Sequence, residues 1–240
     1  AIQSKTFDSQ DSLITHVRAL PEVEVSTLCI EENAMLQYKG RQAVVTIKGV
    51  EDNFEQLTEI DSILYGYGKF VLYDEIVDYG IMGAQLSSTL GTGLRPIDPI
   101  EVYAPKRGQQ VNMANPTSSF EQAYLFSPGV VFAVNQEKYD ATYVLTSMDF
   151  ARRLFDYDTE ITSLELKLKE GTNTGTVQRK IQQLLGADFR VQNRYEQQAD
   201  VFRIMEIEKL ISYLFLSFIL LVACFNIIGS LSMLIIDKKE

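Results

Sequence analysis

The chain has 240 residues, of which 46% are hydrophobic, so it can form one large globular domain or two small ones. Its formal net charge at pH 7 is −10. A chain this acidic lacks the surplus of lysine and arginine that phosphate backbones require, which excludes nucleic acid as a partner. The two cysteines, Cys29 and Cys224, lie in an acidic body and in an apolar run respectively. This separation excludes a disulfide scaffold and a cysteine-based zinc site.

Short helical and extended patterns alternate through the first half of the chain. Ile14 and Val17 belong to an apolar face at helical spacing that Pro21 ends, and Val45 and Ile47 alternate with polar residues as in a half-buried strand. The expected helices cover residues 11–20 and 79–90. The expected strands cover residues 25–30, 43–50, 70–73, 100–104, 121–126 and 130–134, the last two on either side of a Pro128-Gly129 turn.

Residues 105–119 form a polar segment between two expected strands, with no evident role in a core. Two interpretations stay open: a passive hairpin tip, or a protruding arm that binds a partner. In the second, the basic pair would steer an acidic partner and the remaining side chains would supply adaptable contacts. The candidate partner-binding residues are Lys106, Arg107, Met113, Asn115 and Pro116.

The pattern after residue 138 is more regular. A strand over 143–146 is followed by a helix that Ser147 can cap, a strand over 161–168, a helix that Gly186 closes and a last strand over 188–192. Strands and helices that alternate at such short intervals indicate an α+β fold with a layer of βαβ units. We expect residues 1–50 and 139–193 to form that layer, and residues 51–138 to be a β-rich insertion.

Residues 194–209 again have a helical pattern, and neither glycine nor proline interrupts it before the apolar run that follows. We therefore expect a continuous helical stalk that couples the domain rigidly to that run. The candidate coupling residues are Phe202, Met205, Glu206 and Lys209.

Residues 210–236 contain no charged side chain. A helix of this length spans about 40 Å against roughly 30 Å of bilayer hydrocarbon, so we expect a transmembrane helix rather than a buried core helix or a signal peptide. Small and polar residues in it let another helix approach closely, and Asn226 would find a partner there or be satisfied locally. The candidate packing residues are Phe225, Asn226, Gly229 and Ser230.

Lys238 and Lys239 follow the apolar run, within a short charged segment at 237–240. The positive-inside rule then places this end in the cytoplasm and residues 1–209 outside it. The abrupt start and end predict that the chain is a fragment of a longer membrane protein.

No catalytic, cofactor-binding or metal-binding motif occurs in the sequence. His16 is the one histidine, and residues 156–160 resemble the start of a calcium loop but have Ile161 where glycine is needed. The adjacent carboxylates at 31–32, 51–52 and 74–75 are interpreted as solubilising charge. We therefore expect neither an enzyme nor a bound cofactor.

The sequence resembles a known family of membrane proteins over nearly all of its length, most specifically in the apolar run. The segments MEIEK at 205–209, VACFNII at 222–228 and KKE at 238–240 closely resemble the second transmembrane helix of lipoprotein-releasing (LolC/LolE-type) ABC permeases. Three upstream segments resemble further motifs of the family: IKGVED at 47–52, IMG at 81–83 and YVLT at 143–146. The wider group includes MacB-type and FtsX-type permeases.

This resemblance implies a periplasmic domain with a porter-like βαβ layer and a β-rich sabre-like insertion, followed by a stalk and a transmembrane helix. It implies a dimer of permease subunits in the bacterial inner membrane, driven by a separate ATPase subunit. The implied activity is release of lipoproteins, with a periplasmic lipoprotein carrier as a further partner of the arm. The alternatives are an FtsX-type permease that regulates a cell-wall hydrolase and a MacB-type exporter of peptides or antimicrobials.

Overall fold

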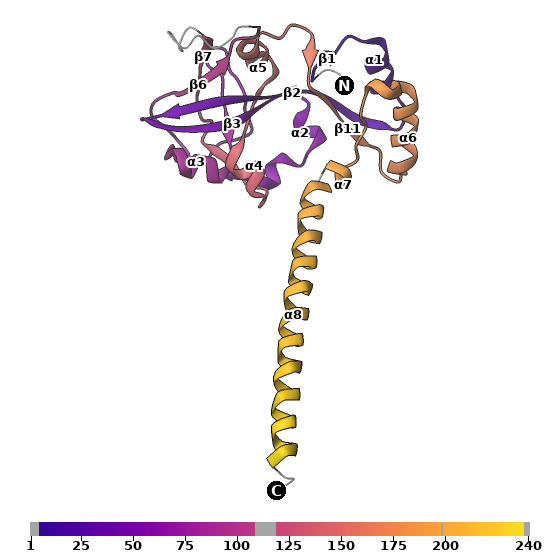
Figure 1. The fold of residues 1–240 in the computed structure, drawn as a ribbon. Coiled ribbons are helices and arrows are strands. Elements are labelled where there is room, and N and C mark those ends of the chain that lie inside the picture. The colour runs from indigo at the N-terminus through magenta and orange to yellow at the C-terminus, as the bar shows by residue number, and fades with distance from the viewer. Residues whose placement is uncertain (1–4, 109–118, 198, 238–240) are drawn as a thin grey trace. The chain divides into compact units, whose positions relative to one another are not determined.

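The chain divides into two units, Ala1–Arg190 and Val191–Glu240, in a computed structural model that describes residues 5–108, 119–197 and 199–237. Figure 1 labels the helices α1 to α8 and several of the strands. The first unit combines helices and strands and contains a curled sheet (Figure 1). The predicted α+β fold class is therefore confirmed.

A long antiparallel hairpin, β2 (Val23–Tyr38) and β3 (Arg41–Val50), forms the centre of the main sheet. The sheet has seven strands in the order β5-β9-β3-β2-β6-β7, and β11 also pairs with β2. The other strands of this sheet are β5 (Ile81–Met82), β6 (Ile100–Pro105), β7 (Phe120–Leu125), β9 (Tyr143–Ser147) and β11 (Ser163–Leu168).

The predicted βαβ arrangement is present in a split form. β9 pairs with β3 in parallel, β3 with β2 antiparallel, and β2 with β11 antiparallel. β9 and β11 therefore run in the same direction with two strands between them, and α5 (Met148–Phe155) begins directly after β9. Ser147 caps α5 as predicted, since its hydroxyl accepts a hydrogen bond from the Phe150 N–H at 3.2 Å. At Gly49 of β3 an added Cβ would lie 2.3 Å from the Cβ of Ala151, so this close helix–strand packing requires glycine.

Smaller elements surround this sheet. Two further sheets pair β1 (Phe7–Asp8) with β10 (Glu160–Ile161), and β4 (Leu64–Gly66) with β8 (Val130–Phe132). The remaining helices of the first unit are α1 (Ser12–Arg18), α2 (Phe54–Leu57), η1 (Ile60–Ile63), α3 (Ala84–Leu90), α4 (Glu137–Thr142), α6 (Thr174–Leu185) and η3 (Gly186–Asp188).

The core consists of two buried clusters. Leu28 and Ile30 of β2 lie in the first, together with the apolar face of α5, whereas Cys29 lies in the second with Phe54 and Phe132. Because successive side chains of a strand point to opposite faces, the two clusters cover the two faces of the sheet around β2. Burying one large aliphatic or aromatic side chain contributes about 1.5–3 kcal/mol, so both faces contribute substantially to stability.

Two elements predicted for residues 70–90 are wrong in part. The strand over 70–73 is absent apart from an isolated bridge between Tyr73 and Asp78, because the Asp74 carboxylate accepts the N–H groups of Ile76 and Val77 at 2.7 and 2.8 Å and turns the chain. The helix over 79–90 begins only at Ala84. The residues before it form β5, which pairs with β9.

The strand predicted over 188–192 is absent as well. The side-chain amide of Gln182 donates hydrogen bonds to the carbonyls of Gly186 and Phe189 at 2.7 and 2.8 Å. The Phe189 ring packs edge-on against Phe7 at 5.3 Å between centroids. These side-chain contacts replace a strand ladder in this segment.

Most other predicted elements are confirmed, and β2 is longer than predicted. The apolar faces of α1 and α6 are buried as expected except at Leu13 and Leu184, which are exposed. The division of the first unit into porter-like and sabre-like parts stays a prediction. Strands of residues 51–138 and of the flanking ranges share one sheet.

The second unit contains α7 (Arg194–Gln197) and α8 (Ala199–Asp237). α7 starts in a capping box, in which Asn193 accepts the Glu196 N–H at 2.9 Å and Glu196 accepts the Asn193 N–H at 3.0 Å. The predicted helical start at Arg194 is therefore correct. α8 runs through the apolar segment from Ala199 to Asp237. Residue 198 lies outside the described residues, so a stalk that is continuous from Arg194 stays a prediction.

Candidate functional site

The arm predicted at 105–119 has a defined base. β6 and β7 form an antiparallel hairpin up to the pair Pro105–Phe120, and the Lys106 N–H donates to the Ser119 carbonyl at 2.9 Å. The strands on either side of the arm are therefore confirmed. Residues 109–118, with the candidates Met113, Asn115 and Pro116, lie outside the described residues.

The two basic candidates at this base differ in their surroundings. Arg107 forms an ion pair with Glu160 at 2.7 Å and stacks over the Tyr157 ring at 5.1 Å. The hydrogen bond from Arg107 lowers the pKa of the Glu160 carboxyl. Lys106 contacts Glu121 only at 3.8 Å, with both side chains largely exposed. Arg107 is therefore held against the body, and the role of this basic pair in partner binding stays a prediction.

A hollow of about 420 Å³ lies beside this arginine. The hollow is lined in part by Arg107, Arg152 and Tyr157. The Nε of Arg152 is buried and has no hydrogen-bond partner among the described residues. Arg152 is not among the residues predicted from the sequence, where its only signal is its place in the last turn of a helix that precedes the acidic 156–160 loop.

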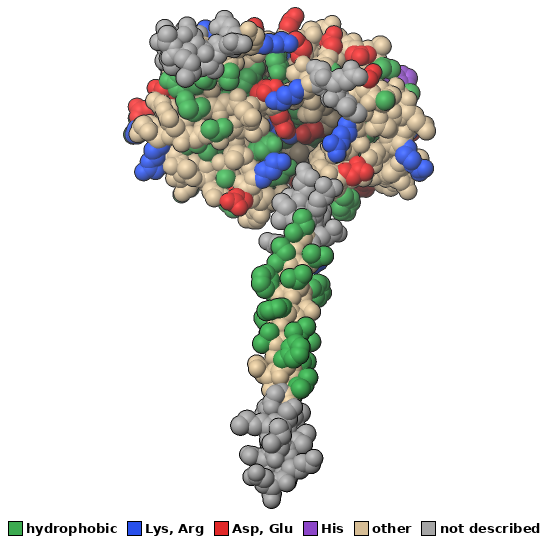
Figure 2. Space-filling view, in the orientation of Figure 1, with side chains coloured by type: hydrophobic (Ala, Val, Ile, Leu, Met, Phe, Trp, Pro, Cys, Tyr) green, Lys and Arg blue, Asp and Glu red, His purple; other side chains and the backbone are tan. Residues whose placement is uncertain are grey.

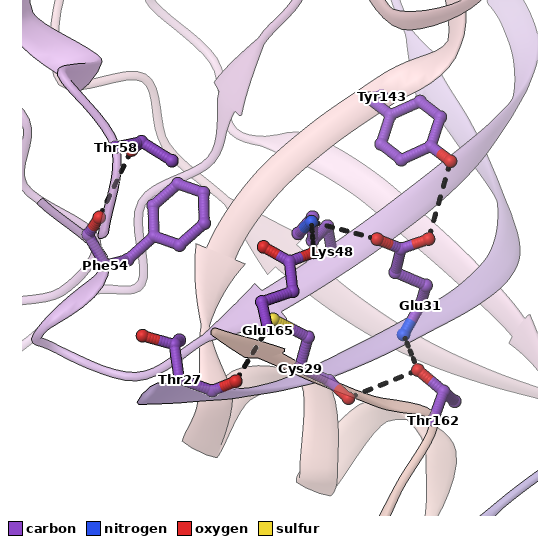
Figure 3. Close-up of polar contacts among 9 residues, drawn as sticks. All are labelled: Thr27, Cys29, Glu31, Lys48, Phe54, Thr58, Tyr143, Thr162 and Glu165. Atoms are coloured by element: carbon purple, nitrogen blue, oxygen red, sulfur yellow. Dashed lines mark hydrogen bonds and ion pairs between the residues drawn. The ribbon is translucent and has the colours of Figure 1, made fainter. Parts of the chain in front are cut away.

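A buried ion cluster on the sheet is likewise absent from the sites predicted from the sequence (Figure 3). Lys48 of β3 lies directly opposite Glu31 of β2, with 3.0 Å between nitrogen and oxygen, and forms a second ion pair with Glu165 of β11. Only 13% of the Lys48 side chain is exposed. Tyr143 of β9 donates to Glu31 at 3.4 Å. The cluster thus joins four strands across one face.

The electrostatics of this cluster follow from burial and charge. Burial by itself would lower the pKa of Lys48, but the carboxylates of Glu165 and Glu31 outweigh it and hold the pKa above its usual value. Burial raises the pKa of Tyr143 to about 12, and the Glu31 charge adds to this shift. Burial also raises the pKa of Cys29 well above its ordinary value. The cluster therefore holds a charged lysine and a neutral thiol, with no activated nucleophile.

The interpretation of adjacent carboxylates as solubilising charge is wrong for several of them. Glu31 belongs to the ion cluster, and Glu51 accepts the Leu28 N–H at 2.7 Å and pairs with Arg18 at 3.4 Å. Asp74 organises the turn described above. These carboxylates satisfy backbone and basic groups within the fold, which is a structural role.

The apolar segment of α8 has the properties of a membrane span. Residues Lys209–Ile228 have a mean hydropathy of 2.4, and none of this segment is buried against the described protein. Figure 2 shows hydrophobic side chains along the described part of the helix. Lys209, Phe225 and Asn226 are exposed.

Five further candidates lie in the second unit. The backbone of α8 includes all of them, but their side chains lie outside the described ones: Phe202, Met205, Glu206, Gly229 and Ser230. Their coupling and packing roles, like those of Lys209, Phe225 and Asn226, stay predictions.

Within the described ranges, no group of three or more His, Cys, Asp or Glu side chains is placed to hold a metal ion. His16 lies exposed on α1, as expected for a surface histidine.

No known protein-family model matches the sequence. Among solved structures, the chain is similar to the extracellular domain of the noncanonic ABC-type transporter YknZ from Gram-positive bacteria, with a TM-score of 0.51 and 10% identity over 77% of this chain and 84% of that one. The chain therefore shares the fold of an extracellular domain of an ABC-type transporter.

A weaker likeness links the chain to the periplasmic region of MacB from Actinobacillus actinomycetemcomitans. It has a TM-score of 0.48 and 8% identity over 72% of this chain and 71% of that one. A domain of a putative permease protein from Porphyromonas gingivalis is also similar, with a TM-score of 0.39 and 13% identity over 79% and 73%.

Proposed function

We propose that this chain is the extracytoplasmic domain, with the membrane helix that follows it, of a permease subunit of an ABC transporter. The observation that carries the proposal is the fold shared with the extracellular domain of an ABC-type transporter, followed in the same chain by the apolar helix α8. In this proposal a separate subunit hydrolyses ATP, and residues 1–209 lie on the periplasmic side of the bacterial inner membrane.

The finer proposal is release of lipoproteins from that membrane. It is supported by the resemblance of residues 205–240 to the second transmembrane helix of lipoprotein-releasing permeases. The partners are then an ATPase subunit, a second permease subunit, the lipoprotein substrate and a periplasmic lipoprotein carrier.

We assign each proposed interaction to a separate segment of the chain. The 105–119 arm would bind the carrier, and the face of α8 with Asn226 would pack against another transmembrane helix. The segment before Lys209 would transmit motion from the ATPase to the domain. A helix of 39 residues is about 58 Å long, which is enough to cross a bilayer and extend beyond it.

The test is reconstitution of the full-length protein with its ATPase and second permease subunit in proteoliposomes. A fluorescent triacylated lipoprotein is incorporated, and its transfer to a soluble carrier is measured with ATP and with a non-hydrolysable analogue. ATP-dependent transfer supports the finer proposal. ATPase activity that responds to a peptide substrate, with no lipoprotein transfer, favours the MacB-type exporter. ATP-dependent activation of a cell-wall hydrolase without transport favours the FtsX-type regulator.

A further inference from the structure

A second hollow in the first unit, of about 400 Å³, has no residue of the ion cluster in its lining. It is formed where the segment before β5, the segment before β6 and the turn between β7 and β8 meet. The residues that carry the argument below line it: Lys69, Val71, Arg95, Pro96 and Pro128.

Both cations of this hollow are unpaired. Neither Lys69 nor Arg95 forms a hydrogen bond, an ion pair or a ring contact within the described part of the chain, and both are exposed. Nearly every other lysine and arginine described up to residue 190 has such a partner. The exceptions besides these two are Arg152 and Arg190. The hollow therefore concentrates uncompensated positive charge.

Val71 lines the same hollow, and two further exposed apolar residues adjoin its lining along the backbone. Tyr67 is 87% exposed, and its N–H donates to the Gly129 carbonyl at 3.1 Å, next to Pro128 of the lining. Ile97 is 90% exposed and directly follows Pro96. Val71 lines the hollow and is itself 40% exposed. An exposed apolar group of this kind beside cations is typical of an interaction surface rather than of ordinary solvated surface.

The walls are held together before any partner arrives. The Ser127 hydroxyl donates to the Leu94 carbonyl at 2.8 Å and accepts the Gly129 N–H at 3.2 Å. One side chain thus ties the segment of Arg95 to the β7–β8 turn. A surface fixed in this way binds with a smaller entropic cost than a mobile loop.

We propose that this hollow and its rim are a docking surface for a protein segment that carries a carboxylate between apolar side chains. The carboxylate would lie between Lys69 and Arg95, and the apolar groups would cover Tyr67, Val71 and Ile97. An anionic membrane fits less well. Residues 51–80 contain eight carboxylates against one lysine, so a negative lipid surface would be repelled. A peptide can present one carboxylate to the two cations alone.

The experiment uses the full-length protein in neutral phosphatidylcholine nanodiscs and a defined probe. The probe is a fluorescein-labelled peptide, Ser-Val-Tyr-Glu-Val-Ser, and its control has Gln in place of Glu. Fluorescence polarisation is measured with empty nanodiscs as background. We expect saturable binding of the Glu peptide that weakens with salt, and binding of the Gln peptide that is about tenfold weaker.

Substitutions then assign the site. The double variant Lys69→Gln/Arg95→Gln should lose about tenfold in affinity for the Glu peptide, and Tyr67→Ser should weaken both peptides. Arg190→Gln is the matched control, because it removes an equally unpaired cation outside the hollow, and it should bind as the wild type does.

Three results would overturn the proposal: equal affinity for the Glu and Gln peptides, unchanged affinity in the double variant, or no saturable binding of the Glu peptide. Parallel binding assays identify other occupants. Saturable binding of inorganic phosphate, or of vesicles of phosphatidylcholine and phosphatidylglycerol but not of phosphatidylcholine alone, together with no saturable binding of the Glu peptide, would refute the peptide site and reassign the surface to a free anion or to lipid.

Discussion

Replacing Lys48 by methionine removes the charge that Glu31 and Glu165 share while nearly preserving the volume of the side chain. Methionine fills the same space above the sheet, so the change tests charge rather than packing. The two carboxylates then lie on neighbouring strands without a cation between them. We expect the variant to fold with a lower free energy of unfolding than the wild type.

The magnitude follows from the burial of the three side chains. Removing one partner of a fully buried ion pair costs about 3–5 kcal/mol. The Glu31 and Glu165 side chains are 31% and 29% exposed, so water screens part of this loss, and about 2–3 kcal/mol remains. With a urea m-value near 3 kcal/mol/M, the unfolding midpoint should fall by about 1 M.

The assay is urea unfolding of the full chain in detergent, followed by near-ultraviolet circular dichroism of its 12 tyrosines, since the chain has no tryptophan. Lys167→Met is the matched control. Lys167 pairs with Glu24 at 3.3 Å on the same sheet, but both side chains are more than 40% exposed, so its loss should cost less than about 1 kcal/mol.

Two further measurements sharpen the test. Adding Glu31→Gln and Glu165→Gln to Lys48→Met should restore stability, because no uncompensated charge remains. The raised pKa of Lys48 means that its stabilising charge is fully present below the ordinary lysine pKa of about 10.4 and is lost only as the pH rises through the higher folded value. The difference between wild type and Lys48→Met should therefore be constant from pH 6 to 9. A midpoint shift no larger than that of Lys167→Met would refute the reasoning.

The remaining predictions concern the proposed transport function. Asn226→Leu should weaken assembly with the partner subunits, because it removes a hydrogen bond between helices that is worth about 1–2 kcal/mol in hydrocarbon. Asn226→Gln keeps the amide and is the control; equal copurification of the Leu and Gln variants would contradict the prediction. Replacing Met205 and Glu206 by glycine costs about 1 kcal/mol of helix preference per site and adds a hinge. ATP hydrolysis should persist while transport is lost, and undiminished transport would indicate a tether. Deleting residues 107–118 should leave the circular dichroism spectrum unchanged and abolish carrier binding or lipoprotein release; full release would identify a passive loop.

Local sequence patterns predicted much of the fold. The capped helix α5, its buried face and the strand before it were predictable because a period of 3.6 or 2 residues, a serine cap and a short loop all agree there. The apolar helix α8 was predictable for a stronger reason. An uncharged run of this length has few places other than a bilayer in which its surface is satisfied.

Long-range contacts decided the elements that local patterns missed. The second half of β2 begins with Glu31, Glu32 and Asn33, a polar run that does not look like the interior of a sheet. It extends because Lys48 on β3 compensates Glu31, and because Tyr157 donates to Glu32 at 2.8 Å. Both partners come from segments distant in sequence. The turn at Asp74 and the late start of α3 likewise depend on side-chain bonds and on pairing with β9.

The features of the candidate sites also differ in whether local sequence or tertiary contacts determine them. The sequence by itself determined the two strands that flank residues 106–119 and an apolar helix long enough to span a membrane, since turn composition and apolar length are local properties. Only the tertiary structure decided which cations are paired. Arg107 pairs with Glu160, whereas Lys69 and Arg95 line one hollow and have no partner among the described residues. Pairing depends on which distant side chains the sheet brings within about 4 Å, and no spacing along the chain encodes that distance.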